Sequence, residues 1–189
     1  IYQILNDTIS IFDPSVYTPG NIELNYIYVD QNGCSNETTD AIVINEFPSV
    51  NAGADVSICS GDSIILRGSG ASTYSWDNSV TDGVSFSPYQ SGIYRLIGTD
   101  TNGCENTDQL EITVFQVPNV NLSSLTPICN VNSGPVQLSG GTPKGGQYVG
   151  FAVSNNRFDP AISGSGFFQV DYSYVDSNGC SSTASQIIT

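Results

Sequence analysis

The sequence contains no histidine and no methionine, and only four of its 189 residues are Lys or Arg. Without histidine there is no imidazole base to activate a Ser, Cys or Thr nucleophile, and zinc loses its usual imidazole ligands. Because eighteen Asp and Glu residues oppose the four basic ones, the net charge is −14. A surface this acidic repels nucleic acid phosphates and anionic membranes. We therefore expect a non-enzymatic protein that binds no nucleic acid and inserts into no membrane.

Long hydrophobic runs are also missing. None approaches the ~18 residues that span a bilayer, and the first residues do not resemble a signal peptide, so we expect any export signal to lie outside this sequence. Amphipathic helical windows are absent as well. Gly, Ser, Thr, Asn and Asp are abundant between short runs rich in Val, Ile, Tyr and Phe. This composition favours an all-β protein with many turns.

One motif, Asp-x-Asn-Gly-Cys, occurs three times, at residues 30–34, 100–104 and 176–180. Each copy follows one strand-like run and precedes another, which is typical of a hairpin. Asn-Gly favours a type I′ turn, because both central residues of that turn need positive φ. Three such turns indicate three copies of one domain.

The repeat boundaries follow from internal similarity. Residues 1–43 align with 147–189 without a gap, so we expect residues 1–46 to be the C-terminal part of a repeat, or a domain truncated at its N-terminus. Two further Ig-like repeats are predicted at 47–117 and 118–189. A proline lies just inside each junction and makes the linker short and stiff. We therefore expect tandem domains in an extended rod.

Strand-like runs separated by turn residues recur about every ten residues in the second repeat, the spacing of a β-sandwich. Alternating apolar residues around Tyr26 and Tyr172 predict half-buried strands with these tyrosines in the core, although exposed tyrosines could also stack on a sugar. Trp76 is interpreted as a core residue. The Gly-rich stretch 139–146 is predicted to be a mobile loop between strands.

The five cysteines fit the repeat pattern. Cys59 and Cys104 lie near the two ends of the second repeat, and Cys129 and Cys180 near the two ends of the third. We predict one disulfide within each repeat, each worth ~4 kcal/mol in the chain-entropy model. Cys34 is expected to be unpaired because its partner would lie upstream of Ile1; a free reactive thiol or a metal ligand are the alternatives.

Disulfides of this kind imply an oxidising, extracellular compartment. No cofactor is required by the sequence. Calcium remains an alternative at Asp30, Asp100, Asp176 or near Glu46, because hard oxygen ligands are plentiful there. The Asp and Asn of the motif also have a sufficient role in the turn itself.

Several segments together resemble the Ig-like or PKD-like repeats of large surface proteins from Bacteroidota, including gliding adhesins. The matching segments are residues 51–55, 58–62, 74–76, 92–94 and 100–104, with 145–148, 158–160 and 174–180 similar to a companion repeat type. Trp76-Asp77-Asn78-Ser79 departs from the PKD core, so the Ig-like family fits better.

The resemblance implies cell-surface localisation, export by the type IX system, and a structural stalk role in attachment or gliding motility. Its implied partners are neighbouring repeats of the same chain, and a surface polysaccharide or another protein. Two alternatives stay open: a glycan-binding module that uses Tyr2, Tyr89 or Tyr148, and a spacer in a secreted polysaccharide-degrading enzyme.

Overall fold

The computed structural model describes residues 2–4, 7–9, 12–129 and 134–189. In this part of the chain, helix is limited to two short turns, η1 (Pro14–Val16) and α1 (Pro160–Ser163). None of the described helices has the length and apolar character needed to cross a membrane. The remaining regular structure is β-strand in several small sheets, which confirms the all-β prediction.

The chain divides into two compact units. Unit 1 comprises Ile1–Gly53, Ile65–Val84 and Tyr94–Leu110, and unit 2 comprises Ala54–Ile64, Ser85–Ile93 and Glu111–Thr189. This division passes through the segment assigned to the second repeat. The division into three repeats therefore stays a prediction from the sequence.

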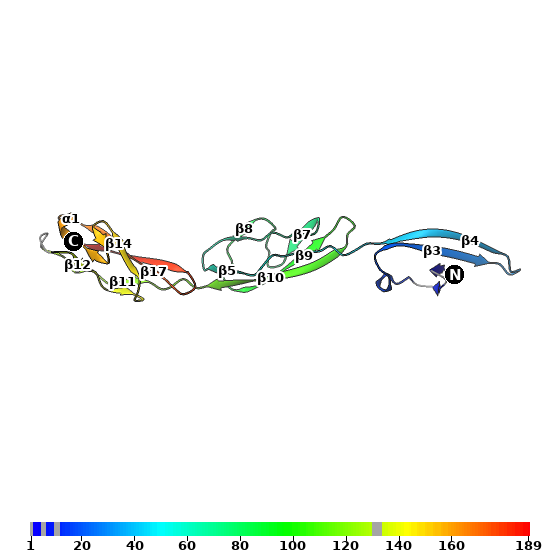
Figure 1. Cartoon of the computed structure of the whole chain (residues 1–189), viewed down its shortest axis with the longest axis horizontal. Coiled ribbons are helices and arrows are strands. Elements are labelled where there is room, and N and C mark those ends of the chain that lie inside the picture. Colours follow the sequence, from blue (N-terminus) through cyan, green and yellow to red (C-terminus); the bar gives the residue numbers. More distant parts are fainter. Residues whose placement is uncertain (1, 5–6, 10–11, 130–133) are drawn as a thin grey trace. The chain divides into compact units, whose positions relative to one another are not determined.

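A four-stranded sheet in the order β2-β1-β3-β4 lies within unit 1. Its two long strands form a hairpin, visible as the paired blue and cyan arrows of Figure 1, that closes where Val29 pairs with Ser35. The hairpin therefore ends on the first copy of the cysteine motif. The strands are β1 (Tyr2–Ile4), β2 (Asp7–Ile9), β3 (Gly20–Val29) and β4 (Ser35–Ile44).

Residues 47–117, the predicted second repeat, hold a four-stranded sheet in the order β5-β10-β9-β7 and a two-stranded sheet, β6-β8. Strand β5 runs parallel to the second half of β10, and β7 runs antiparallel to β9. The first strand of the repeat thus lies beside its last strand. The strands are β5 (Val56–Cys59), β6 (Ile64–Ile65), β7 (Thr73–Trp76), β8 (Ser85–Phe86), β9 (Gly92–Thr99) and β10 (Glu105–Phe115).

Three sheets lie within unit 2, in the orders β11-β13, β12-β16-β15 and β14-β17-β18. The longest pairing joins β17 to β18 and closes on the third copy of the cysteine motif, between Val175 and Ser181. The strands are β11 (Asn121–Leu122), β12 (Val136–Gln137), β13 (Gly141–Thr142), β14 (Gln147–Gly150), β15 (Val153–Ser154), β16 (Arg157–Phe158), β17 (Phe168–Val175) and β18 (Ser181–Ile188).

The core of unit 2 is a cluster of four buried side chains, Leu138, Phe158, Val170 and Ile188. They come from β16, β17, β18 and the residue after β12, so the two three-stranded sheets share one apolar centre. Burial of apolar area drives this association at about 25 cal/mol per Å².

Tyr172 explains why the stretch 139–146 is rich in glycine. The Tyr172 ring lies against the backbone of Gly141 and Gly146. A Cβ added at either glycine would come within 2.5 Å of a ring atom. The Tyr172 hydroxyl accepts a hydrogen bond from the Gly146 amide (2.8 Å) and donates one to the Pro143 carbonyl (2.5 Å). The stretch is therefore not a loop throughout, as the sequence predicted, because it includes β13 and closes over a buried tyrosine.

The tyrosine prediction holds in the third repeat and fails in the first. Tyr172 is 2% exposed, whereas its counterpart Tyr26 is 36% exposed and Tyr28 is 58% exposed. Tyr172 is buried because the stretch 139–146 packs over its ring, with Gly141 and Gly146 in close approach.

Candidate functional site

The three cysteine motifs fold into the same hairpin loop. In the first copy, the Asp30 carboxylate accepts hydrogen bonds from the backbone amides of Asn32 (2.8 Å) and Cys34 (2.9 Å). The Gly33 amide donates to the Asp30 carbonyl at 3.1 Å, which closes the turn. The copies at Asp100 and Asp176 repeat all of these bonds, with distances that differ by 0.2 Å at most.

The turn type differs from the prediction. Only the glycine of each motif takes positive φ, +83° at Gly33, +84° at Gly103 and +85° at Gly179. The loop is therefore a type I turn followed by a left-handed glycine, not a type I′ turn. The Asp side chain selects this form, because its Oδ1 caps two amides inside the loop. Two consecutive positive φ values occur instead at Asn155 and Asn156, which join β15 to β16.

One disulfide is present, between Cys59 and Cys180, with the two Cα atoms 5.6 Å apart. Cys180 is fully buried and Cys59 is half-buried, and both lie in unit 2. The bond joins β5, the first strand of the predicted second repeat, to the cysteine turn of the predicted third repeat. The sequence predicted different bonds, Cys59 with Cys104 and Cys129 with Cys180, and that pairing was wrong.

Strand length explains the error. Cys59 is the register partner of Phe115, the last residue of β10, whereas Cys104 precedes the first residue of β10. Eleven residues at about 3.4 Å each separate the two ends of the strand by more than about 30 Å. The Cα atoms of a disulfide lie roughly 4.4–6.8 Å apart, so a bond within the repeat is impossible.

The third repeat has the same arrangement. The Ile128 amide donates to the carbonyl of Thr189 (2.8 Å), which places Cys129 beside the end of β18, while Cys180 precedes the start of that strand. We call Cys59 and Cys129 the leading cysteines, and Cys34, Cys104 and Cys180 the turn cysteines. The two kinds therefore lie at opposite ends of a repeat.

Three cysteines carry free thiols: Cys34 and Cys129 are exposed, and Cys104 is half-buried. Each lies at a position equivalent to one of the two bonded cysteines. The chemistry that this set of residues can perform is thiol oxidation to a disulfide.

The acidic residues considered for calcium are spread among the three turns. In each turn one carboxylate oxygen, Oδ1 of Asp30, Asp100 or Asp176, is engaged by two backbone amides. Within the described ranges, no three His, Cys, Asp or Glu side chains gather in a group that could hold a metal ion. Glu46, near which the other calcium site was expected, is exposed.

The aromatic residues considered for sugar binding have different surroundings. Tyr148 is half-buried, with its ring centroid 4.7 Å from that of Tyr172 and its hydroxyl accepting from the Gly141 amide. Tyr89 is 81% exposed. Tyr2 lies in β1, and its side chain is outside the described part of the structure.

Trp76 is buried, in agreement with its predicted core role. Its indole Nε1–H donates to the Asp82 carboxylate at 2.9 Å, and the same oxygen accepts from the Gly68 amide at 2.7 Å. Asp82 thus satisfies the polar edge of the only tryptophan and anchors a loop. Sequence reasoning missed Asp82, because a partner six residues away in a turn carries no distinctive pattern.

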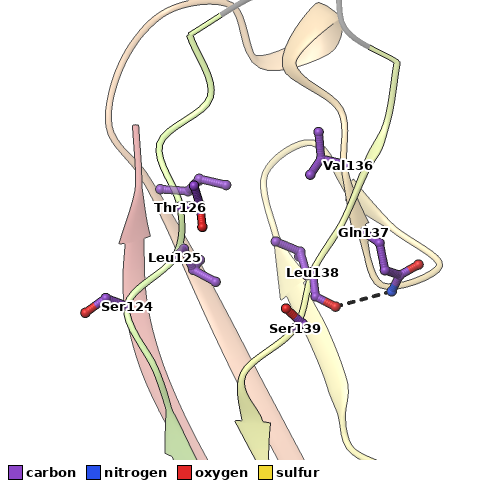
Figure 2. Close-up of a pocket in the computed structure, with 8 residues that line it drawn as sticks. Ser124, Leu125, Thr126, Val136, Gln137, Leu138 and Ser139 are labelled. Atoms are coloured by element: carbon purple, nitrogen blue, oxygen red, sulfur yellow. Dashed lines mark hydrogen bonds between the residues drawn. The ribbon is translucent and has the colours of Figure 1, made fainter.

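A small pocket of about 100 Å³ lies in unit 2 between two segments and the end of β18. Figure 2 shows Ser124, Leu125 and Thr126 on one side, and the segment from Val136 to Ser139 on the other. Typical pockets for small organic ligands are about 300–1,000 Å³. This pocket has room for a few water molecules and is too small to enclose a sugar ring with its substituents.

Two carboxyl groups on strands have lowered pKa values. Hydrogen bonds from the Ala52 amide first, and then from the Gln109 amide, lower the pKa of Asp108 below its ordinary value of 3.8. The Ser185 hydroxyl first, and then the Gln169 amide, lower the pKa of Asp171 in the same way. In both cases the donors favour the ionised form. Asp108 links β10 to the backbone at Ala52, and Asp171 links β17 to a side chain of β18.

No protein-family model matches the sequence, and no curated protein matches it. Among solved structures, the chain is similar to a Ca²⁺-stabilized adhesin that helps an Antarctic bacterium reach out and bind ice, with 13% identity and a TM-score of 0.40. The match covers 90% of this chain and 57% of the adhesin chain. This chain therefore spans little more than half of that protein's length.

Cadherin ectodomains are similar as well. The chain matches extracellular cadherin domains 1–4 of protocadherin gamma B7 at 10% identity and a TM-score of 0.30, covering 100% of this chain and 64% of that one. It matches the human desmocollin-1 ectodomain at 14% identity and a TM-score of 0.25, covering 98% and 50%. Similarity this distant assigns neither a ligand nor a role.

Proposed function

We propose that the chain is a non-enzymatic structural segment of a bacterial cell-surface adhesin, in which tandem repeats form a stalk that holds a binding region away from the cell. The observation that carries the proposal is the Cys59–Cys180 disulfide. A covalent bond between successive repeats limits how far the chain can lengthen, because the residues that the bond encloses cannot be stretched even when a repeat unfolds. Attachment or gliding motility, with export by the type IX system, is the setting that the sequence resemblance implies.

The path of force along the chain supports this role. The disulfide joins residues 121 positions apart in the sequence. Force applied to the two chain ends is therefore transmitted from Cys59 directly to Cys180 through the disulfide, and the residues between them are not stretched. Residues 60–179, which hold most of the second and third repeats, carry none of the load along their backbone.

Two further properties suit an extracellular stalk. Disulfides persist in oxidising compartments outside the cytosol. A net charge of −14 keeps repeats soluble and discourages them from collapsing onto one another. Neighbouring repeats of the same chain are the partners that this proposal requires.

Single-molecule pulling from the two termini tests the proposal. With the disulfide intact, the fully unfolded chain should reach an end-to-end length of about 240 Å, because only residues 1–59 and 180–189 can be stretched. With reductant it should reach about 640 Å. The Cys59→Ser variant should give the longer extension under both conditions, and Cys34→Ser, which leaves the bond intact, should behave like the unaltered chain.

Equal extension with and without reductant would show that the Cys59–Cys180 bond does not carry the applied force. Glycan binding is the competing function, and an array of surface polysaccharides distinguishes it from the stalk. Strong, saturable binding by this chain, lost on Tyr89→Ala, would place a glycan-binding module ahead of the stalk.

A further inference from the structure

The disulfide between Cys59 and Cys180 is one closed example of a joint whose two halves recur elsewhere in the chain. One half is a leading cysteine, which lies beside the end of the last strand of its repeat. The other half is a turn cysteine, held by the Asp-x-Asn-Gly loop of another repeat. Cys59 supplies the first half and Cys180 supplies the second.

The turn half has the same conformation whether or not its cysteine forms a disulfide. Around the free Cys34, the Asp30 carboxylate binds the Cys34 amide at 2.9 Å, the same distance as between Asp176 and the bonded Cys180. The backbone amide of the aspartate donates to the cysteine carbonyl in both loops, at 2.9 Å. The loop therefore presents its thiol in the same way with or without a partner, and Cys34 is exposed.

The leading half also has a free counterpart. Cys59 lies opposite Phe115 at the end of β10, and the next residue, Ser60, donates its amide to the Phe115 carbonyl at 2.7 Å. Cys129 follows Ile128, whose amide donates to the Thr189 carbonyl just beyond β18 at 2.8 Å. Cys129 thus occupies, beside the last strand of the third repeat, the place that Cys59 occupies in the second. It too is exposed.

We propose that the two exposed free cysteines, Cys129 and Cys34, are open halves of this joint, and that each forms a disulfide with the complementary half of another repeat of the same kind. The rule is directional: the leading cysteine of one repeat bonds to the turn cysteine of the next. A second copy of this chain supplies both halves, so two copies join head to tail through Cys129 of one and Cys34 of the other. The proposal concerns the joint alone and stands whether or not the chain serves as a stalk.

The chemistry is a balanced two-electron oxidation. Both S–H bonds break and one Sγ–Sγ bond forms between Cys129 and Cys34. The two protons and two electrons pass to a small-molecule disulfide such as oxidised glutathione, whose S–S bond breaks to give two thiols. The reaction proceeds by thiol–disulfide exchange, so an exposed thiol on each side is sufficient to begin it.

The test is oxidation of the whole chain with a glutathione redox buffer, followed by non-reducing electrophoresis and mass-spectrometric mapping of linked peptides. The unaltered chain should give a ladder of multimers that reductant abolishes, with the Cys34–Cys129 peptide as the dominant new link. Cys34→Ser and Cys129→Ser should each lose the ladder. An equimolar mixture of these two variants should give dimers and nothing larger, because each variant retains only one half of the joint.

Cys104→Ser is the matched control, since it removes a free thiol that this link does not use, and its ladder should persist. If exposed thiols were oxidised at random, the Cys34–Cys34 and Cys129–Cys129 links would together be as frequent as the Cys34–Cys129 link. That result overturns the proposal, as would an intrachain Cys34–Cys129 bond, a dominant Cys104 link, or a mixture of the two variants that stays monomeric.

Discussion

Asp100 shows at the scale of one residue how a carboxylate fixes a turn. Its Oδ1 accepts hydrogen bonds from the amides of Asn102 and Cys104, and Gly103 then takes a positive φ of +84°. The same three roles recur at Asp30 and Asp176. The side chain thus determines both the loop conformation and the direction of the neighbouring thiol.

Replacing this carboxylate should destabilise the repeat. Asp100→Ala leaves two turn amides with water as their only partner, and a net loss of ~1 kcal/mol in the free energy of unfolding is expected. Urea unfolding followed by tryptophan fluorescence measures the loss, because Trp76 lies in the same repeat. Thr101→Ala, one position along the same loop, is the control and should change stability little. Equal effects of the two substitutions would contradict the capping role.

At the scale of elements, single side chains also tie neighbouring strands together. Asp171 on β17 faces Ser185 on β18 in the register of the sheet, and the Ser185 hydroxyl donates to its carboxylate at 2.6 Å. Gln169, on the same strand as Asp171, adds a second donor at 2.8 Å. The β17-β18 hairpin, which closes on the bonded turn cysteine, is therefore reinforced along its length.

This contact predicts how stability depends on pH. Because the folded pKa of Asp171 is lowered, its carboxylate stabilises the folded state at pH values above its unfolded pKa, near 3.8. That contribution is lost as the pH falls through the lower folded pKa. The melting temperature of the unaltered chain should therefore fall more steeply below about pH 4 than that of Asp171→Asn, measured by calorimetry. Parallel curves for the two proteins would show that the contact contributes nothing.

At the scale of the whole molecule, charge is the dominant feature. Eighteen acidic residues face four basic ones, so the folded chain repels itself. The Debye length falls from about 30 Å at 0.01 M salt to less than about 10 Å above 0.1 M, and the repulsion weakens accordingly.

Added salt should therefore stabilise the chain. Raising NaCl from about 0.01 M to about 0.5 M should increase the melting temperature by about 2–4 °C, the shift that corresponds to ~1 kcal/mol in a chain of this size. An unchanged or lower melting temperature would contradict this expectation. CaCl₂ at matched ionic strength separates screening from binding, because a larger increase with calcium would indicate a bound ion.

Local features of this protein were predictable because they depend on short-range chemistry. Alternation of apolar residues predicted the strands, and Asp-x-Asn-Gly predicted where the long hairpins close, at Val29 and at Val175. The exact turn type was missed, because the choice between two Asn-Gly loops depends on which amides the aspartate side chain reaches.

Which cysteines bond was decided only by the tertiary structure. Sequence position predicted that Cys59 and Cys104 lie at the two ends of one repeat, and the structure places them at opposite ends of β10. The error was to treat the two ends as neighbours. A strand of eleven residues keeps them apart, and the linker after Phe115 instead brings the turn of the next repeat to Cys59. The sequence by itself indicated that a disulfide joins a leading cysteine to a turn cysteine. The fold decided that the joint lies between repeats, because a rigid strand fixes the distance between its ends and a disulfide tolerates little variation in that distance.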